Sequence, residues 1–485
     1  MQASNRLLLC AGALVALGLA RAGANPAPAS MLPSVANYPS IQQALDANPG
    51  RMVFVPAGDY VIARAVVIKG DGAGLWGQGR LIQSNPEEPV LLVQDGRYQK
   101  VRGLILTRPE GKRDTRKPAL HLLRAILASV EDVQVIDNWT DNAALRSDKC
   151  RQLVVRGCLV ENYCRVTIED WTKPAPNSGV CSGFAYICMN GTAMDFVDVS
   201  GVIIQGNRIV ENRLLPTKEN KEKYGFGKFT KKNAEKGPHI DQQSWDTEYW
   251  YGWRQGAGIH VGSGRTSDTI QIVGNYLENM QQGIDIHGDH ALVANNIVND
   301  ASRGIKAMHG SRNIQIIGNQ FNRCDHFAIG LMQGAASHEA GRHPSKGPMA
   351  VEANIDGHSI IADNIISDFG YGLEGWVWQS DGRSGNPIQI GGKSPLAATP
   401  PLRNVIVRGN IVYNTGQDRI VVDGQPRVEP PRYKHAVRVV DGLPSDNPNG
   451  QGGYANTPRK VLFSENHFDP GTDGVSGVDL NTLHR

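Results

Sequence analysis

Seven segments of the chain repeat one pattern of apolar and polar positions. Each has an alternating run of apolar and polar residues, then Asn, a second apolar pair and a further Asn or Asp, as in IQIVGNYLEN, ALVANNIVND and IQIIGNQFNR. Alternation predicts short strands, and Asn-rich ends predict turns. Asn275, Asn295 and Asn319 are 20 and 24 residues apart, which is typical of the coils of a parallel β-helix. We expect these asparagines to point inward at a turn and to hydrogen-bond neighbouring coils.

The sequence before the first predicted strand indicates a capping helix. YPSIQQALDANPG predicts a short amphipathic helix that Ser40 caps and Gly50 ends, and such a helix covers the open edge of a first coil. This helix, the strand VFVPAGDYVI, the LWGQGR turn and the Asn-rich coils together resemble the pectate-lyase-like right-handed β-helix superfamily over residues 37–470. The resemblance implies an all-β, single-stranded, right-handed parallel β-helix that has long loop inserts and acts on carbohydrate.

The first residues have the features of a secretory signal peptide. An early arginine precedes an apolar run that is too short to span a membrane, and small residues follow it. No later stretch is apolar enough to span a membrane, so we expect a secreted or periplasmic protein without a membrane partner. The predicted parts are a signal peptide over residues 1–24, a linker over 25–36, a catalytic β-helix over 37–470 and a C-terminal tail over 471–485.

Composition argues against a nucleic-acid partner and against a zinc site. Fifty basic and 47 acidic residues give a net charge of +3, which does not predict a nucleic-acid partner. The six cysteines after the signal peptide include no C-x-x-C pair, which argues against zinc; one or two disulfides and buried free thiols are both open. We expect no cofactor and no metal, although some members of the superfamily use calcium, for which Asp285, Asp289 and Glu374 are candidate ligands. The sequence leaves the oligomeric state open.

A short motif recurs once per coil. A small residue and an aliphatic residue are followed by a third residue, which is often ionisable. The aliphatic residue points into the core, so the third residue points outward, and successive coils stack about 4.8 Å apart. The motif therefore predicts an outward ladder of Asp195, His260, Asp285, Lys306, Gly330 and Glu374. The next outward positions include His287 and Trp376.

Two long inserts enter the coils that carry this ladder. Residues 213–256 are rich in lysine and then in tryptophan and tyrosine, and residues 333–357 add histidines and basic residues. Long inserts on a compact scaffold are often functional, and aromatic faces stack on sugar rings whereas lysines attract acidic groups. We expect the inserts to flank a glycan cleft, although the aromatic residues could instead anchor the insert to the coils. Candidate substrate-binding residues are Asp195, Trp250, Trp253, His309, Glu374 and Trp376.

The ladder offers the groups that β-elimination at a uronic acid requires. A cation neutralises the carboxylate, a base removes the C5 proton and an acid protonates the leaving oxygen. A neutral histidine is a competent base near neutral pH, and Lys306 beside Asp285 should stay charged. The catalytic candidates are His260, Asp285, His287, Lys306 and Arg303. We therefore predict a polysaccharide lyase.

Three other functions are compatible with the same residues. A glycoside hydrolase would use two carboxylates from Asp195, Asp285 and Glu374. The segment Asp285-Ile286-His287 is similar to the Asp-Pro-His core of mannuronan epimerases, without the proline, which implies a uronan C5-epimerase. A non-catalytic glycan-binding β-helix would need only the aromatic residues and a polar ladder, in which Asp285 and Lys306 form a surface ion pair of little energetic consequence.

Overall fold

A computed structural model describes residues 32–174, 181–237, 240–262, 266–307, 311–332, 357–379, 385–391, 402–414, 420–427, 429–440 and 457–484. Pro33–Arg485 form one compact unit. The predicted signal peptide and residues 333–356 of the second insert lie outside the described residues. The predicted domain boundaries at residues 36 and 470 therefore stay predictions.

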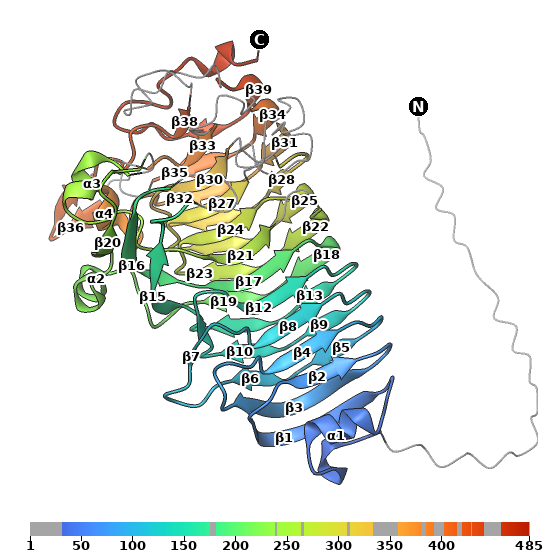
Figure 1. Cartoon of the computed structure of the whole chain (residues 1–485). Helices are drawn as coiled ribbons and strands as arrows, with labels where there is room; N and C mark the ends of the chain where they lie inside the picture. The colour runs from blue at the N-terminus through green and yellow to red at the C-terminus, as the bar shows by residue number, and fades with distance from the viewer. Residues whose placement is uncertain are drawn as a thin grey trace, which may run out of the picture. The chain divides into compact units, whose positions relative to one another are not determined.

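The compact unit is a right-handed parallel β-helix, which confirms the predicted fold class. Its strands stack coil upon coil (Figure 1), in a 22-stranded sheet that runs from β1 (Met52–Ile62) to β40 (His467–Phe468) and in a second parallel sheet of 11 strands. The second sheet matters most here because it carries the ladder. In spatial order its strands are β2 (Val66–Lys69), β4 (Leu91–Gln94), β8 (Leu120–Leu123), β12 (Ala143–Asp148), β17 (Thr192–Val197), β21 (Ala257–Gly262), β24 (Gln282–Ile286), β27 (Arg303–Ala307), β30 (Phe327–Leu331), β33 (Ile388–Ile390) and β38 (Val437–Val439).

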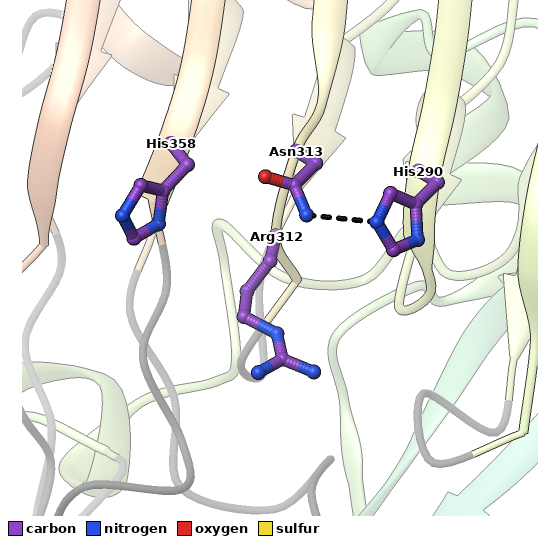
Figure 2. Close-up of a pocket in the computed structure, with 4 residues that line it drawn as sticks. All are labelled: His290, Arg312, Asn313 and His358. Carbon is purple, nitrogen blue, oxygen red and sulfur yellow. Dashed lines mark hydrogen bonds between the residues drawn. The ribbon is translucent and has the colours of Figure 1, made fainter.

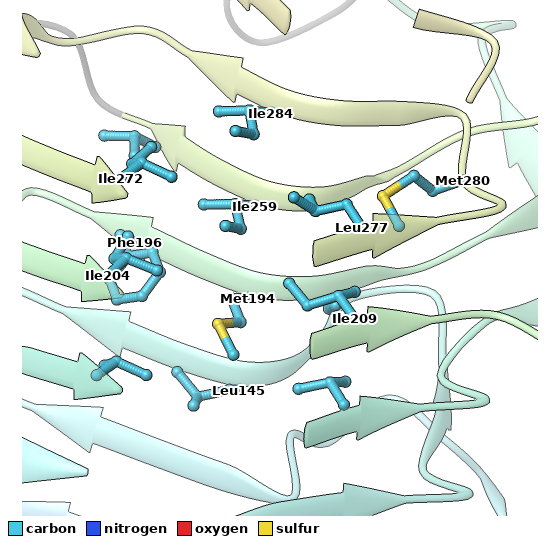
Figure 3. Close-up of a cluster of buried hydrophobic side chains, with 14 of the residues drawn as sticks. Leu145, Met194, Phe196, Ile204, Ile209, Ile259, Ile272, Leu277, Met280 and Ile284 are labelled. Carbon is cyan, nitrogen blue, oxygen red and sulfur yellow. The ribbon is translucent and has the colours of Figure 1, made fainter. Parts of the chain in front are cut away.

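The core is a column of aliphatic side chains, one from each coil. Met194 pairs in register with Leu145 on one side and with Ile259 on the other, and Ile259 pairs with Ile284. All four are buried, and Figure 3 shows them stacked opposite side chains of the other sheet such as Ile272. Burial of each such side chain stabilises the fold by roughly 1.5–3 kcal/mol. Because these positions face inward, the residue that follows each of them faces outward.

An inward-facing asparagine ladder runs through the turns, as predicted, but with one different member. The amide Nδ2 of Asn275 donates to Asn296 Oδ1 at 2.9 Å, and that of Asn296 donates to Asn319 Oδ1 at 2.9 Å. Asn295 is instead exposed and has a left-handed backbone (φ 55°), so the prediction for Asn295 is wrong by one residue. Among the described residues the ladder consists of Asn207, Asn275, Asn296, Asn319, Asn364, Asn410 and Asn466.

The first coil is covered by α1 (Ile41–Asp46), which confirms the predicted capping helix. Its N-cap is Ser40, whose side chain accepts a hydrogen bond from the backbone N–H of Gln43. The side chain of Gln42 forms two hydrogen bonds with the backbone of Val67 on β2, at 2.7 and 3.2 Å, so it closes the free edge of the 11-stranded sheet. The helix ends at Asp46 rather than at Gly50.

Three further strands stand beside the coils. The antiparallel sheet consists of β15 (Arg165–Asp170), β16 (Phe184–Asn190) and β20 (Phe229–Lys232), of which β20 belongs to the insert 213–256. The insert also forms α2 (Lys218–Tyr224) and α3 (Gln242–Asp246). All six cysteines of the described residues are free thiols. None of the helices in the described residues is long and apolar enough to cross a membrane.

Candidate active site

The outward ladder is present on the 11-stranded sheet. Strand register places Asp195 beside His260, His260 beside Asp285, and Asp285 beside Lys306. Gly330 follows Lys306, as predicted, and leaves the ladder without a side chain at that rung. We call the outward residues from His121 to Lys306 the polar strip: His121, Arg146, Asp195, His260, Asp285 and Lys306, together with His287, which lies against Asp285.

Sequence reasoning missed the first two members of the polar strip. His121 pairs with Arg146, and Arg146 pairs with Asp195. The signal was available, since Ala119-Leu120-His121 and Ala144-Leu145-Arg146 both repeat the motif of a small residue, an aliphatic residue and an ionisable residue. These two coils lie outside the region in which the Asn-rich repeats are most regular, so the motif alone would have had to reveal them.

Two other predicted members do not belong to the ladder. Gln389, not Glu374, follows Gly330 in register. Glu374 lies just before α4 (Gly375–Gln379), where its carboxylate pairs with Arg254 at 2.9 Å, and both side chains are 1% exposed. Trp376 on α4 donates its indole N–H to the carbonyl of Pro216 in the first insert at 3.0 Å. Neither residue is an outward rung, because the chain leaves the coil after β32 (Ile365–Ser367) and returns at β33.

His260 is held by a carboxylate. Its Nδ1 lies 2.7 Å from Asp195 Oδ1. An ionised carboxylate only accepts hydrogen bonds, so Nδ1 is the donor and Nε2 carries the lone pair of the neutral ring. Burial opposes protonation of His260, but the hydrogen bond and the charge of Asp195 outweigh it and raise the pKa of His260 above its ordinary value.

His287 occupies the next outward position after Asp285. Its Nε2 lies 3.0 Å from Asp285 Oδ1, and the other oxygen of Asp285 lies 2.9 Å from Lys306 Nζ. Burial is the largest influence on His287 and lowers its pKa, although the Asp285 carboxylate acts in the opposite direction. The rings of His260 and His287 are edge to face with centroids 5.1 Å apart. The strip therefore holds two adjacent imidazoles whose pKa values are moved in opposite directions.

Asp285 and Lys306 form a buried ion pair. Burial opposes ionisation of Asp285, but Lys306 and then His287 hold its pKa well below the ordinary range. Burial also lowers the pKa of Lys306, and the Asp285 charge counteracts this. The pair is more buried than the exposed surface pair considered from the sequence, because Asp285 is 5% exposed. Loss of either partner would leave a buried charge, which is costly.

Arg303 begins the strand that carries Lys306. Its guanidinium lies over the ring of Phe327 at 5.8 Å, and among the described residues it forms no hydrogen bond or ion pair. Burial lowers the pKa of Arg303, while the charges of Glu374 and Asp285 raise it. The N–H donors of the Arg303 guanidinium are thus not used by an acceptor of the described residues, and they lie beside the polar strip.

The aromatic residues of the first insert mostly pack inward. Trp253 is fully buried and stacks on Phe226 with centroids 5.2 Å apart, so the prediction that Trp253 stacks on a sugar ring is wrong. Tyr249 packs against Phe184 and Tyr186 on β16. Trp250 is partly buried against the core, and its predicted contact with substrate stays a prediction. His309 lies outside the described residues.

Within the part of the chain that the structure describes, the polar strip contains one group of metal-ligand type. One ligand atom each from His260, Asp285 and His287 lie within 4.8 Å of one another. The carboxylates suggested for calcium are each paired with a different cation: Asp285 with Lys306, Asp289 with Arg312 and Glu374 with Arg254.

A separate cavity of about 390 Å³ lies away from the polar strip. Figure 2 shows His290, Asn313 and His358 in a row, with Arg312 beneath them. Asn313 donates to His290 Nε2 at 3.0 Å, and Arg312 pairs with Asp289. His290 lies on β25 (Asp289–Ala294) and His358 on β31 (Gly357–Ala362), both strands of the 22-stranded sheet.

The stacked coils define the class of fold, which is a right-handed parallel β-helix. The family model described as "Periplasmic copper-binding protein (NosD)" matches residues 230–386, which include His260, Asp285 and His287. No curated protein matches the sequence.

Several solved structures are similar at low sequence identity. ORF18 of Geobacillus virus E2 is 12% identical with a TM-score of 0.47, and the match covers 80% of this chain but only 62% of the viral protein. The mannuronan C-5 epimerase A-module of Azotobacter vinelandii is 12% identical, with a TM-score of 0.44 and coverage of 92% and 99%. An exopolygalacturonase from Thermotoga maritima is 10% identical, with a TM-score of 0.44 and coverage of 77% and 83%.

Proposed function

We propose that the protein is a secreted or periplasmic lyase that cleaves a uronic-acid-containing polysaccharide by β-elimination. The observation that carries the proposal is the pair of adjacent imidazoles, His260 and His287, each oriented by its own carboxylate. Two titratable groups whose environments separate their pKa values are suited to act as acid and base in one reaction. The predicted signal peptide and the periplasmic description of the matching family support the location.

His287 is the base in this mechanism. Its Nε2–H donates to Asp285, so Nδ1 accepts a proton when the ring is neutral. The lowered pKa keeps His287 neutral at and above ordinary histidine values. Asp285 fixes the tautomer and stabilises the imidazolium that forms when the C5 proton is removed.

His260 is the acid. The raised pKa favours the protonated ring, whose Nδ1–H stays with Asp195 and whose Nε2–H is donated to the leaving glycosidic oxygen. Arg303 binds the uronate carboxylate, because its guanidinium is not engaged by a carboxylate of the described residues, and planar donors match a carboxylate well. Lys306 adds positive charge to the strip and keeps Asp285 ionised.

The hydrolase and epimerase alternatives receive less support. A hydrolase needs a protonated carboxylic acid, whereas Asp285 has a lowered pKa and Glu374 is buried against Arg254. An epimerase returns the proton to the opposite face of the sugar. The rings of His260 and His287 lie edge to face within the polar strip, so both would meet a bound chain from one side, which favours elimination.

Ultraviolet absorbance of the unsaturated uronate tests the proposal. The purified mature protein is incubated with a panel of acidic polysaccharides, and absorbance, reducing ends and C5 configuration are followed together. We expect absorbance and reducing ends to rise in parallel. The rate of both should fall by about 100-fold or more in His287→Ala and should be unchanged in the control His290→Ala. Reducing ends without absorbance would select the hydrolase, changed configuration alone the epimerase, and binding alone the non-catalytic β-helix.

A second candidate function is copper binding. The matching family is described as copper-binding, and His260, Asp285 and His287 place three ligand-type atoms within 4.8 Å. Two imidazoles and a carboxylate suit a divalent transition metal. Titration of the protein with Cu²⁺ against a chromophoric chelator tests this: His260→Ala and His287→Ala should each weaken binding by about tenfold or more, whereas His358→Ala should not. Equal affinity in all three variants would reject the site.

A further inference from the structure

Arg146 lies in the polar strip but outside the proposed acid–base pair. It sits on β12, between His121 of β8 and Asp195 of β17. Its Nη1 donates to Asp195 Oδ2 at 2.8 Å and to Asn142 Oδ1 at 3.2 Å. The oxygen of Asp195 that Arg146 binds is therefore not the oxygen that binds His260, since Oδ1 lies 2.7 Å from His260 Nδ1.

The guanidinium of Arg146 is itself fixed on its other edge. Nε and Nη2 bind the two oxygens of Asp148 at 2.7 and 2.9 Å, and Asp148 Oδ2 also lies 2.8 Å from His121 Nε2. A two-point contact to a carboxylate sets the plane of a guanidinium as well as its position. The third nitrogen is thus directed at Asp195 by a rigid fork rather than by a flexible charge.

We propose that Arg146 is a positioning residue that clamps the Asp195 carboxylate and thereby fixes the tautomer and orientation of His260. With Oδ2 held by Arg146, only Oδ1 is available to His260, and the imidazole can meet it only through Nδ1–H. The clamp leaves Nε2 as the outward nitrogen of His260. Partners of this kind behind a functional histidine typically change its performance by about 10- to 100-fold when they are removed.

The clamp does not depend on which proposed function is correct. It deepens the lyase proposal, because an acid must present Nε2–H to the leaving oxygen, and it equally serves a metal, because a ligand must present the Nε2 lone pair. The test therefore observes the His260–Asp195 hydrogen bond itself and uses no substrate. A protein without lyase activity could still show the clamp, and a lyase could lack it.

The experiment is proton–nitrogen NMR of the full mature chain labelled with ¹⁵N-histidine. His260→Ala identifies the Nδ1–H signal of His260, and its exchange with water is measured in wild type and in Arg146→Gln. We expect a protected signal in wild type and exchange faster by about tenfold or more in Arg146→Gln. Arg146→Lys should restore little protection, because an ammonium cannot hold Asp148 and Asp195 in the same fork.

The matched control is Arg323→Gln. Arg323 also binds an aspartate of a neighbouring coil through two nitrogens, Nε to Asp300 Oδ1 at 2.9 Å and Nη2 to the second oxygen, but it lies outside the polar strip. Thermal melts and circular dichroism show whether each variant is folded. If Arg146→Gln does not fold, Asn142→Ala combined with Asp148→Asn releases the guanidinium instead. An unchanged His260 signal in a folded Arg146 or Asp148 variant overturns the proposal, as does a wild-type protein without a protected His260 Nδ1–H.

Discussion

The imidazole of His260 fits beside Asp195 because residue 262 is a glycine. A Cβ at Gly262 would lie 2.8 Å from Cε1 of His260 and 3.5 Å from both ring nitrogens. Contacts below 3.0 Å force one group to move, and the ring is the mobile partner. Gly262→Ala should therefore turn the ring away from Asp195 with little loss of stability. We expect turnover to fall by about tenfold or more, with an unchanged melting temperature; full turnover in a folded variant would show that the ring orientation is unimportant.

Activity should have a bell-shaped dependence on pH. His287 must be neutral, so activity is lost as pH falls through its lowered pKa. His260 must be protonated, so activity is also lost as pH rises through its raised pKa. The active window should therefore straddle the ordinary histidine value of about 6.5. Initial rates across pH measure both limbs.

Asp195→Asn separates the two limbs of this profile. An amide keeps the shape of the side chain but removes the charge that raises the pKa of His260. The alkaline limb should move to lower pH, whereas the acid limb, which depends on His287 and Asp285, should stay in place. An alkaline limb that does not move would show that another group supplies the proton.

At the residue level the sequence predicts the coil positions better than the loop positions. His260, Asp285 and Lys306 follow inward aliphatic residues within regular coils, and register then fixes their neighbours. Glu374 and Trp253 lie on segments that leave the coils, where no repeat relates spacing to direction. Their burial depends on contacts with distant residues, such as Arg254 with Glu374 and Phe226 with Trp253, which a local motif does not encode.

At the scale of elements, the sequence predicts the asparagine ladder but misplaces one of its members. The segment ALVANNIVND offers two consecutive asparagines, and only one of them faces inward. Asn295 adopts the left-handed turn conformation and Asn296 enters the ladder. Which of the two asparagines faces inward depends on where β25 ends and where β26 (Ile297–Asn299) begins. A repeat of 20 residues and one of 21 residues fit the sequence equally well, so the sequence spacing alone does not select Asn296.

Replacement of Asn296 tests whether this ladder stabilises the fold. Asn296→Leu leaves the backbone N–H and Nδ2 of Asn275 without Asn296 Oδ1 as their acceptor. It also removes the Nδ2 donor from Asn319 Oδ1, which keeps only the backbone N–H of residue 296. Each orphaned buried group costs roughly 1–3 kcal/mol, so the denaturant midpoint should fall clearly. Asn295→Gly, one residue away and exposed, is the control and should leave the midpoint almost unchanged, because glycine tolerates the left-handed backbone at this position. Equal midpoints would show that the ladder is not stabilising.

For the whole molecule, the insert 213–256 both supports the coils and presents positive charge. Its aromatic residues join β16 and the core, so deletion of the insert would remove buried contacts. Several of its lysines remain exposed: Lys218, Lys223, Lys228, Lys231 and Lys232. Exposed charge attracts an acidic chain over about 8 Å at physiological ionic strength and is screened by salt.

A triple substitution distinguishes attraction of an acidic glycan by the lysines of the insert from attraction by the net charge of the whole protein. Lys223→Gln, Lys228→Gln and Lys231→Gln together should weaken binding of an acidic glycan by roughly tenfold at low salt and by much less at high salt. The control changes Lys69, Lys100 and Lys460 to Gln, three exposed lysines outside the insert, with the same change of net charge. Isothermal titration across sodium chloride concentrations measures both triples. Equal losses would assign the effect to net charge alone.

Because the coils stack in register, the order of the charged side chains along the helix axis can be changed by removing or adding one coil. Asp285 and Lys306 are 21 residues apart, and so are Asn275 and Asn296, so both faces advance by one rung over the same length of chain. Excision of one such unit would join His260 directly to Lys306 while the asparagines and the aliphatic column closed up behind them. The order of the outward functional groups along the axis is thus set by the order of the coils. Gain or loss of one coil would change which groups are neighbours, and so the chemistry of the site, without redesign of the core.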